Sequence, residues 1–358
     1  MRDLIIVGYG EIYNKPFDHN NAIEPFKNFL KNHYNKEVLF WNASEPITNP
    51  FDLYGWDKMY EFEKLLLEND LIVYGLFGGD KIIKPSQEPI KNYYILSWDT
   101  FLLHYSKYYL EKSYGKQVRD ININPMFNKH FICLNKHPRE QRSITIDNLY
   151  KEGLFEYGLI SWNNLSKNWQ EPYDFKYWEE RVMNLDIDSP EINKLNIHSS
   201  FNTDFLLNHG CVLNYVIETM VDSRNIFISE KTYKNFLINQ PFFSVGSVRH
   251  NRTLKSMGFE LYDELFNYDY EYCVNYEIKL IQMVNQLKKI IDYDVNSLYQ
   301  VVKDKTIKNK ETALKICEND IFIPHQLVDL YVRHKEKFNT NEYIKRECDI
   351  QDIFKNKI

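Results

Sequence analysis

The chain has 358 residues, of which 44% are hydrophobic and 26% are charged, a composition that excludes a disordered or fibrous protein. Its formal net charge of −6 provides no overall attraction to nucleic acid or to an anionic membrane. The length is sufficient for two hydrophobic cores, which predicts two domains.

The five cysteines are widely spaced and include no Cys-x-x-Cys pair, which argues against a disulfide framework and against a zinc knuckle. The apolar run at residues 4–7 is too short for a signal peptide, and no segment has the roughly 20 apolar residues of a membrane span. We therefore expect a cytoplasmic protein with free thiols and no membrane partner. The abundance of Tyr, Phe, Asn, Lys and Ile indicates an AT-rich genome, that of a virus or of an AT-rich bacterium, and a viral origin would place the protein in the host cytoplasm.

Strand-like and helix-like segments alternate through the first 125 residues. Residues 4–7 are branched and apolar and are followed by Gly8 and Gly10, a pattern typical of a buried parallel strand that enters a turn. Further strands are predicted at 37–41, 70–76 and 93–98, and helices at 23–33, 56–69 and 100–112. This alternation predicts a doubly wound α/β domain over residues 1–125.

The alternation starts again after a polar loop at residues 117–128. Strands are predicted at 131–134, 158–162, 212–221, 225–228 and 242–245, helices at 139–152 and 232–238, and an irregular insertion at 163–200. A second α/β domain is therefore expected over residues 126–275. The apolar spacing of residues 276–358 predicts a helical tail, which should pack partly on the first domain because amphipathic helices need apolar partners.

The segment around Ser229 has the pattern of a buried strand followed by a capped helix. Ser229 is suited to cap that helix, and Lys231 falls in its first turn. A helix N-terminus offers unpaired backbone N–H groups and the positive end of the helix dipole, so the junction suits a phosphate group. Glu230 can accept hydrogen bonds from a ribose diol. In the plainer alternative, Ser229 only caps the helix and both charges are solvated.

A second cationic segment follows the strand predicted at 131–134. Asn135 comes directly after that strand, and Arg139 and Arg142 begin the next helix. A planar guanidinium can bind two phosphate oxygens at once, which Lys cannot do. Because both segments follow strands of one domain, they are expected to meet at one edge of its sheet. The alternative is that the arginines are solvated surface charges.

Residues 230–237 and 241–246 resemble the donor-binding signature of the α1,3-fucosyltransferase family and of related viral glycosyltransferases. Residues 133–142 are similar to an earlier stretch of the same family, and the resemblance covers about residues 131–259. It implies a GT-B-like α/β fold, in which two doubly wound Rossmann-like domains face each other across a cleft and are followed by a helical tail. The family usually has an Ala-Gly pair where this chain has Ile238 and Asn239.

The resemblance implies a glycosyltransferase that moves a sugar from a nucleoside diphosphate sugar, with GDP or UDP as the nucleotide, to a hydroxyl acceptor. The acceptor is a saccharide or a modified nucleobase, so nucleic acid is expected only as an acceptor. Transfer is expected to invert the anomeric carbon without a metal ion or other cofactor, because Arg142 and Lys231 can stabilise the departing diphosphate. The implied donor-binding residues are Asn135, Arg139, Arg142, Ser229, Glu230, Lys231 and Tyr233.

The general base that activates the acceptor hydroxyl is expected in the first domain, and it must be a carboxylate or a histidine. Glu11 follows the first predicted strand and is the nominal catalytic base, with His19 and Asp80 as competing residues on the acceptor side. A noncatalytic protein that binds nucleotides or carbohydrates on the same fold is the alternative function.

Two other motifs have plainer explanations than a ligand site. Asp186 and Asp188 have the spacing that holds a divalent cation in metal-dependent GT-A transferases, but no apolar strand leads into them, which favours a solvated loop. Gly8 and Gly10 lack the third glycine of a dinucleotide fingerprint, so NAD is not expected.

Overall fold

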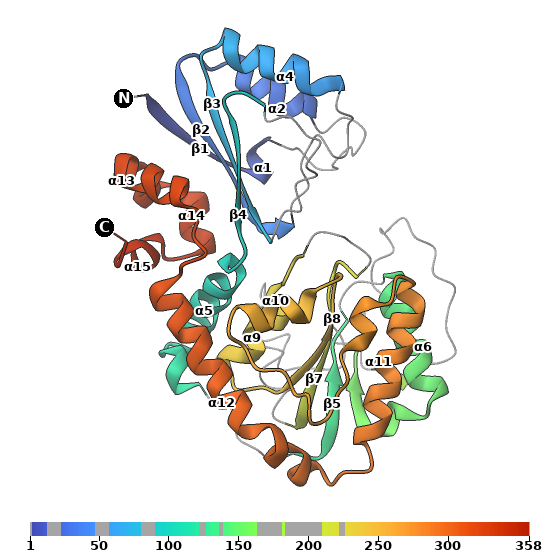
Figure 1. Cartoon of the computed structure of the whole chain (residues 1–358). Helices are drawn as coiled ribbons and strands as arrows, with labels where there is room; N and C mark the ends of the chain where they lie inside the picture. The colour runs from blue at the N-terminus through green and yellow to red at the C-terminus, as the bar shows by residue number, and fades with distance from the viewer. Residues whose placement is uncertain are drawn as a thin grey trace. The chain divides into compact units, whose positions relative to one another are not determined.

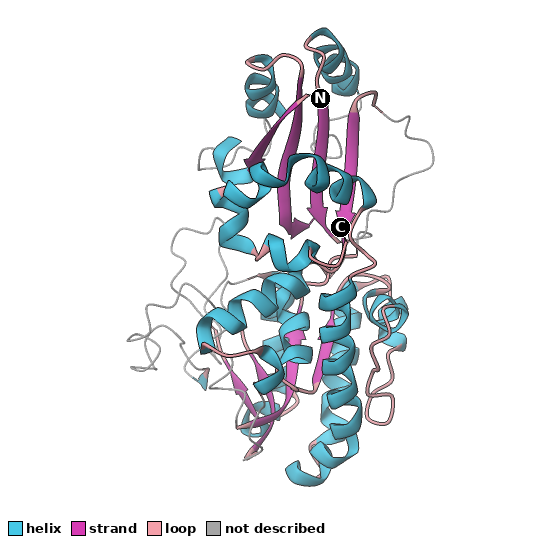
Figure 2. Ribbon diagram, turned by 90° about the vertical axis from the view of Figure 1, so that its left-hand side faces the viewer, coloured by secondary structure: helices cyan, strands magenta, loops and turns pink. Residues whose placement is uncertain are grey.

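The computed structural model describes residues 2–12, 23–46, 57–79, 90–121, 127–135, 139–162, 181–182, 210–221 and 226–357. The chain divides into two compact units, unit 1 (Met1–Tyr108 with Ile316–Ile358) and unit 2 (Tyr109–Lys315). Each unit contains its own four-stranded parallel sheet, and both sheets can be followed in Figures 1 and 2. The predicted α/β class is confirmed. No helix among the described residues is long and apolar enough to cross a bilayer.

The sheet of unit 1 has its strands in chain order. The strands are β1 (Asp3–Gly8), β2 (Lys36–Pro46), β3 (Ile72–Gly78) and β4 (Tyr93–Trp98). The helices are α1 (Tyr9–Ile12), α2 (Ile23–Lys31), α4 (Asp57–Glu68) and α5 (Phe101–Tyr114), and the residues of α5 after Tyr108 belong to unit 2. Right-handed crossovers that advance in one direction place their helices on one face, and Figure 1 shows α2 and α4 on the same side of the sheet. The prediction that this domain is doubly wound is therefore wrong for the described strands, because their order contains no reversal.

The face of this sheet under α2 and α4 is a compact aromatic and aliphatic core. Phe26 of α2 packs against Phe40 of β2 and Phe62 of α4, with ring centroids 5.3 and 5.9 Å apart. Val38 and Val73 lie in the same core and are fully buried. Alternate residues of β2 thus supply this face, as expected for a strand with covered surfaces on both sides.

The opposite face of the same sheet is covered by the end of the chain (Figure 1). The helices concerned are α13 (His325–Thr340), α14 (Glu342–Glu347) and α15 (Ile350–Phe354), which follow α12 (Val295–Asn319). The indole of Trp41 donates to Glu347 Oε2 at 2.7 Å, and Phe354 stacks on Tyr331 with ring centroids 4.3 Å apart. Residues 276–315 belong instead to unit 2, so the helical tail is divided between the two units.

Asp320, just after α12, fixes the chain where it returns to unit 1. Its carboxylate is buried and accepts hydrogen bonds from Trp98 Nε1 at 3.0 Å, His104 Nε2 at 2.7 Å and the hydroxyl of Thr100. Burial raises the pKa of Asp320, but the hydrogen bonds from His104, Thr100 and Trp98 outweigh burial and hold that pKa below its ordinary value. The ionised carboxylate therefore connects the C-terminal segment to the end of β4.

The sheet of unit 2 has the strand order β6-β5-β7-β8, and all its pairs are parallel. Its strands are β5 (Lys129–Cys133), β6 (Gly158–Ile160), β7 (Cys211–Ile217) and β8 (Phe242–Val245). The chain passes from β5 to β6 on one side of β5 and then crosses to β7 on the other side of β5. The sheet is therefore doubly wound, and its topological switch point lies between β5 and β7. The strand predicted at 225–228 is reduced to an isolated bridge at Ile226.

Helices cover both faces of this second sheet (Figures 1 and 2). They are α6 (Glu140–Lys151), α9 (Glu230–Leu237), α10 (His250–Ser256) and α11 (Tyr276–Ile290), with short 3-10 helices at Val118–Asp120, Leu154–Tyr157 and Asp269–Tyr272. Helices α6 and α11 pack together on one face, and α9 contacts β7 and β8. Two covered faces explain why β7 is buried at every position.

Asp320→Asn is expected to lower the free energy of unfolding by about 3 kcal/mol at pH 7, because a carboxamide cannot replace a buried ionised acceptor of several hydrogen bonds. The folded-state pKa of Asp320 lies below its ordinary value of 3.8. The stabilisation is therefore present above that value and is lost as pH falls through the folded-state pKa. Urea unfolding at pH 7 and below pH 4 should show the difference between variant and wild type shrinking in acid.

Asp352→Asn is the matched control, since its partly exposed carboxylate pairs with Lys107 and Lys355. Its effect should stay below about 1 kcal/mol. Equal losses for the two variants would contradict the role given to Asp320.

Candidate functional site

The carboxyl end of β7 places a buried acid, Glu218, next to the switch point of the unit 2 sheet. Its backbone N–H continues the ladder to Val245 of β8 at 2.9 Å. Its carboxylate accepts from the backbone N–H of Ser229 at 3.1 Å, the hydroxyl of Ser229 at 2.5 Å and the hydroxyl of Thr232 at 2.7 Å. Glu218 therefore joins two strands and the start of α9.

Ser229 is the N-cap of α9, as the sequence predicted, with an extended backbone and a side chain that accepts from Lys231 N at 3.2 Å. The N–H of Thr232 bonds the Ser229 carbonyl at 3.1 Å. The expectation of unpaired N–H groups is therefore wrong for Lys231 and Thr232, because Ser229 supplies an acceptor to each. A phosphate here must be held mainly by side-chain cations.

Glu230 and Lys231 form an ion pair at this helix start, with Nζ 3.0 Å from Oε1 and both side chains about one-quarter exposed. Burial alone would raise the pKa of Glu230, but Lys231 and, more weakly, Arg142 outweigh it, so the pKa lies below its ordinary value. Glu230 is thus ionised and is within electrostatic reach of both cations.

Arg142 lies in the first turns of α6 and is only 4% exposed. Burial, followed by repulsion from Arg139, lowers the pKa of Arg142 to about 10, and the carboxylates of Glu218 and Glu230 oppose this shift. The guanidinium stays charged at neutral pH. Glu218 and Glu230 therefore act electrostatically on Arg142, and the donor-binding role predicted for the two cationic segments stays a prediction.

The loop after β5 is tied to the loops after β6 and β7. The N–H of Asn135 donates to Ser161 Oγ at 2.9 Å, and its buried side-chain amide contacts Cys133 Sγ at 3.3 Å. Gln141 of α6 donates to the carbonyl of Thr219, immediately after Glu218, at 3.1 Å. These bonds fix Asn135 and the start of α6 at the switch point, although they leave Asn135 more suited to shaping the loop than to binding a ligand.

Arg142 and Lys231 stand at the starts of α6 and α9, each beside an acid, Glu140 and Glu230. Lys279 of α11 is a further buried ammonium of unit 2, which donates to the carbonyls of Val221 and Gly246 at 3.3 Å each. Arginine and lysine side chains at the carboxyl ends of strands favour an anion with several oxygens.

Tyr233 does not belong to this edge. Its side chain is fully buried, and its hydroxyl lies 3.6 Å from Met257 Sδ. We therefore treat it as a core residue of unit 2, contrary to the expectation that it contacts the donor. The residue missed by sequence analysis is Glu218, whose signal was an acid directly after a buried apolar strand.

The nominal base Glu11 has a structural role in unit 1. It is the third residue of α1, and its carboxylate accepts from the N–H of Gly8 at 2.7 Å, the return bond of a capping box. A Cβ on Gly8 would lie 2.6 Å from the ring of Tyr343, which explains why glycine stands there. His19, Asp80, Asp186 and Asp188 lie outside the described residues. Within the described ranges, no group of three His, Cys, Asp or Glu side chains could hold a metal ion.

Comparisons with protein families, with curated proteins and with solved structures found no match to this chain. The candidate site therefore stands on its geometry and on the motif resemblance alone.

Glu218→Gln is expected to lower the free energy of unfolding by about 2 kcal/mol, because its amide group would face donors from Ser229 and Thr232. Thr232→Val removes one of these donors and should cost about 1 kcal/mol. The loss of unfolding free energy in the double variant should be smaller than the sum of the two single losses, because both substitutions act on one network. Urea unfolding measures all three, and strictly additive losses would argue against a shared network.

Proposed function

We propose that unit 2 binds the diphosphate of a nucleoside diphosphate sugar and that the protein transfers the sugar to a hydroxyl acceptor. The observation that carries this proposal is the convergence of Arg142 and the Glu230–Lys231 pair on Glu218 at the topological switch point. Ligands of doubly wound sheets bind outside the carboxyl ends of the strands at this point. The resemblance to donor-binding motifs of glycosyltransferases names the same residues.

The geometry suggests how a donor is recognised. The guanidinium of Arg142 can bind two phosphate oxygens, and Lys231 provides a compact charge from the adjacent helix. When a diphosphate binds the Lys231 ammonium, it replaces Glu230 as the partner of that lysine. The Glu230 carboxylate can then accept hydrogen bonds from a ribose diol. Glu218 stays buried and keeps the start of α9 in place during this exchange.

The same cations supply the catalytic effect that we propose. As the glycosidic bond breaks, negative charge builds on the departing diphosphate, and preorganised cations stabilise this charge more than that of the bound donor. No metal ion is part of this proposal, because arginine and lysine neutralise the leaving group. By analogy with the family that the motifs resemble, the arrangement is GT-B-like and transfer inverts the anomeric carbon.

A base for the acceptor hydroxyl is still required. Glu11 uses one acceptor position for the N–H of Gly8, and its second carboxylate oxygen can still accept a proton. His19 and Asp80 remain the other acceptor-side candidates. The alternative function is a protein that binds nucleotides without turnover. Binding of UDP or GDP without hydrolysis or transfer of any nucleotide sugar would support that alternative.

Lys231→Ala and Arg142→Ala are each expected to weaken binding of the cognate diphosphate, UDP or GDP, by at least about tenfold. Each removes a charge-assisted hydrogen bond of roughly 1.5–3 kcal/mol. Isothermal titration calorimetry measures the loss. Lys255→Ala is the matched control, because it removes a half-exposed lysine of the same unit that pairs with Asp263.

Arg142→Lys provides a second test in case loss of the buried guanidinium unfolds the protein. It retains the charge but not the two-point contact, so binding should weaken while the fold persists. Wild-type affinity in both the Lys231 and Arg142 variants would place the nucleotide site elsewhere.

A further inference from the structure

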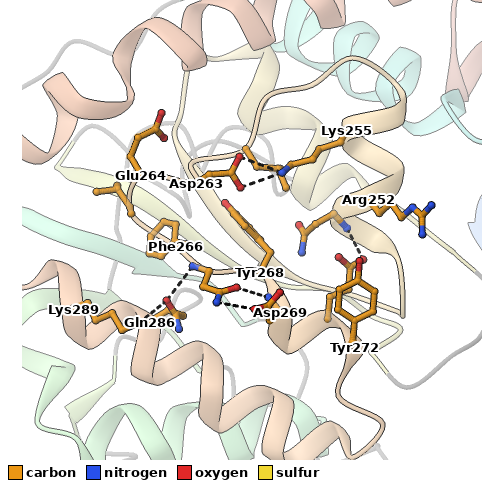
Figure 3. Close-up of a pocket in the computed structure, with 15 residues that line it drawn as sticks. Arg252, Lys255, Asp263, Glu264, Phe266, Tyr268, Asp269, Tyr272, Gln286 and Lys289 are labelled. Atoms are coloured by element: carbon orange, nitrogen blue, oxygen red, sulfur yellow. Dashed lines mark hydrogen bonds and ion pairs between the residues drawn. The ribbon is translucent and has the colours of Figure 1, made fainter.

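Unit 2 contains a cavity that the nucleotide site does not use (Figure 3). It has a volume of about 620 Å³ and is lined by residues 251–289, from α10, the following segment and α11. A smaller cavity of about 320 Å³ shares Asn267, Asp269, Gln286 and Lys289 with it and extends the hollow along α11. The volume lies within the range of about 300–1,000 Å³ that is usual for small-molecule sites.

The charges of this cavity disfavour an anionic ligand. Its four carboxylates outnumber its three cations, and Lys255 is engaged by both oxygens of Asp263 at 3.1 and 3.2 Å. Figure 3 shows this pair on one side of the cavity, with Gln286 and Lys289 on another. A nucleotide should therefore bind more favourably beside the cations around Arg142 than in this cavity.

Planar amide and carboxylate groups in this cavity are held in fixed orientations. Asn267 donates from its backbone to Gln286 Oε1 at 3.2 Å and from its amide to Asp269 Oδ2 at 2.8 Å. The N–H of Asn251 donates to the buried carboxylate of Glu271 at 3.0 Å. A carboxylate has about four acceptor positions, so Asp269 and Glu271 keep capacity for further hydroxyl donors.

The side chains also repeat along α11 in a way that suits an extended ligand. Asn285 and Gln286 follow Gln282 by three and four residues, and Lys289 follows it by seven, so the four side chains share one face of the helix. One helical turn rises about 5.4 Å, comparable to the length of one hexose unit. Tyr272, which is 62% exposed, presents an aromatic face at the cavity. Such a face packs against the C–H side of a sugar ring.

We infer that this cavity binds a neutral oligosaccharide through the amides of α11, the carboxylate of Asp269 and the ring of Tyr272. Sugar hydroxyls both donate and accept hydrogen bonds, so they can pair with the fixed amides and carboxylates of the cavity. A ligand without charge suits a cavity in which four carboxylates stand beside three cations. The site does not depend on the proposed nucleotide site, which lies around the end of β7.

The test uses maltotriose, cellotriose and chitotriose, each titrated into the full chain with methyl-labelled leucine. Leu261 and Leu265 line the cavity and report its occupancy by NMR. At least one trisaccharide should shift both signals, and Tyr272→Ala and Asp269→Asn should each weaken its binding by about tenfold. Tyr293→Ala is the matched control, because Tyr293 is 45% exposed on the same unit and does not line the cavity.

Lys231→Ala separates this inference from the proposed function. Trisaccharide binding should persist in that variant even where nucleotide binding is lost. The inference is overturned if none of the three trisaccharides shifts Leu261 and Leu265, if both cavity variants bind as wild type does, or if UDP and GDP are the ligands that shift these signals.

Discussion

The carboxylate of Glu218 is buried at the end of β7, where an uncompensated charge would be very costly. Three donors from Ser229 and Thr232 compensate for this cost, and they do so only if α9 begins where it does. The negative charge also favours cations nearby, and Arg142 and Lys231 are positioned around it. The position of the helix, the N-cap and the positive edge of the sheet therefore all depend on one interaction.

Unit 1 uses the same kind of constraint for another purpose. Asp320 is buried beside the end of β4 and collects donors from Trp98, Thr100 and His104. These bonds bring residues from the end of the chain onto a sheet built from its beginning. Asp320 in unit 1 and Glu218 in unit 2 are thus buried acids that link separate segments of the chain, as is Glu37 of β2, which pairs with Arg333 and His334 of α13.

Sequence patterns predicted the features that depend on neighbouring residues, namely individual strands and a helix N-cap. The apolar runs at 4–7 and 70–76 became β1 and β3, and Ser229 caps α9 because a short polar side chain before an amphipathic helix can reach its first N–H groups. Strand order depends on pairing between residues far apart in the sequence. The order β1-β2-β3-β4 of unit 1 could therefore not be predicted from the alternation of strand-like and helix-like segments. Likewise, the anchoring of the N-cap of α9 depends on Glu218, eleven residues before Ser229 and across a loop.

We propose that phosphate binds at the switch point of unit 2 between Arg142 and Lys231. A crystal structure of the protein with UDP or GDP would locate the bound diphosphate. We expect the diphosphate in contact with both side chains, with Glu230 separated from Lys231 and turned toward the ribose, while Glu218 keeps its bonds to Ser229. A nucleotide bound elsewhere, or a diphosphate that leaves the Glu230–Lys231 ion pair intact, would rule this proposal out.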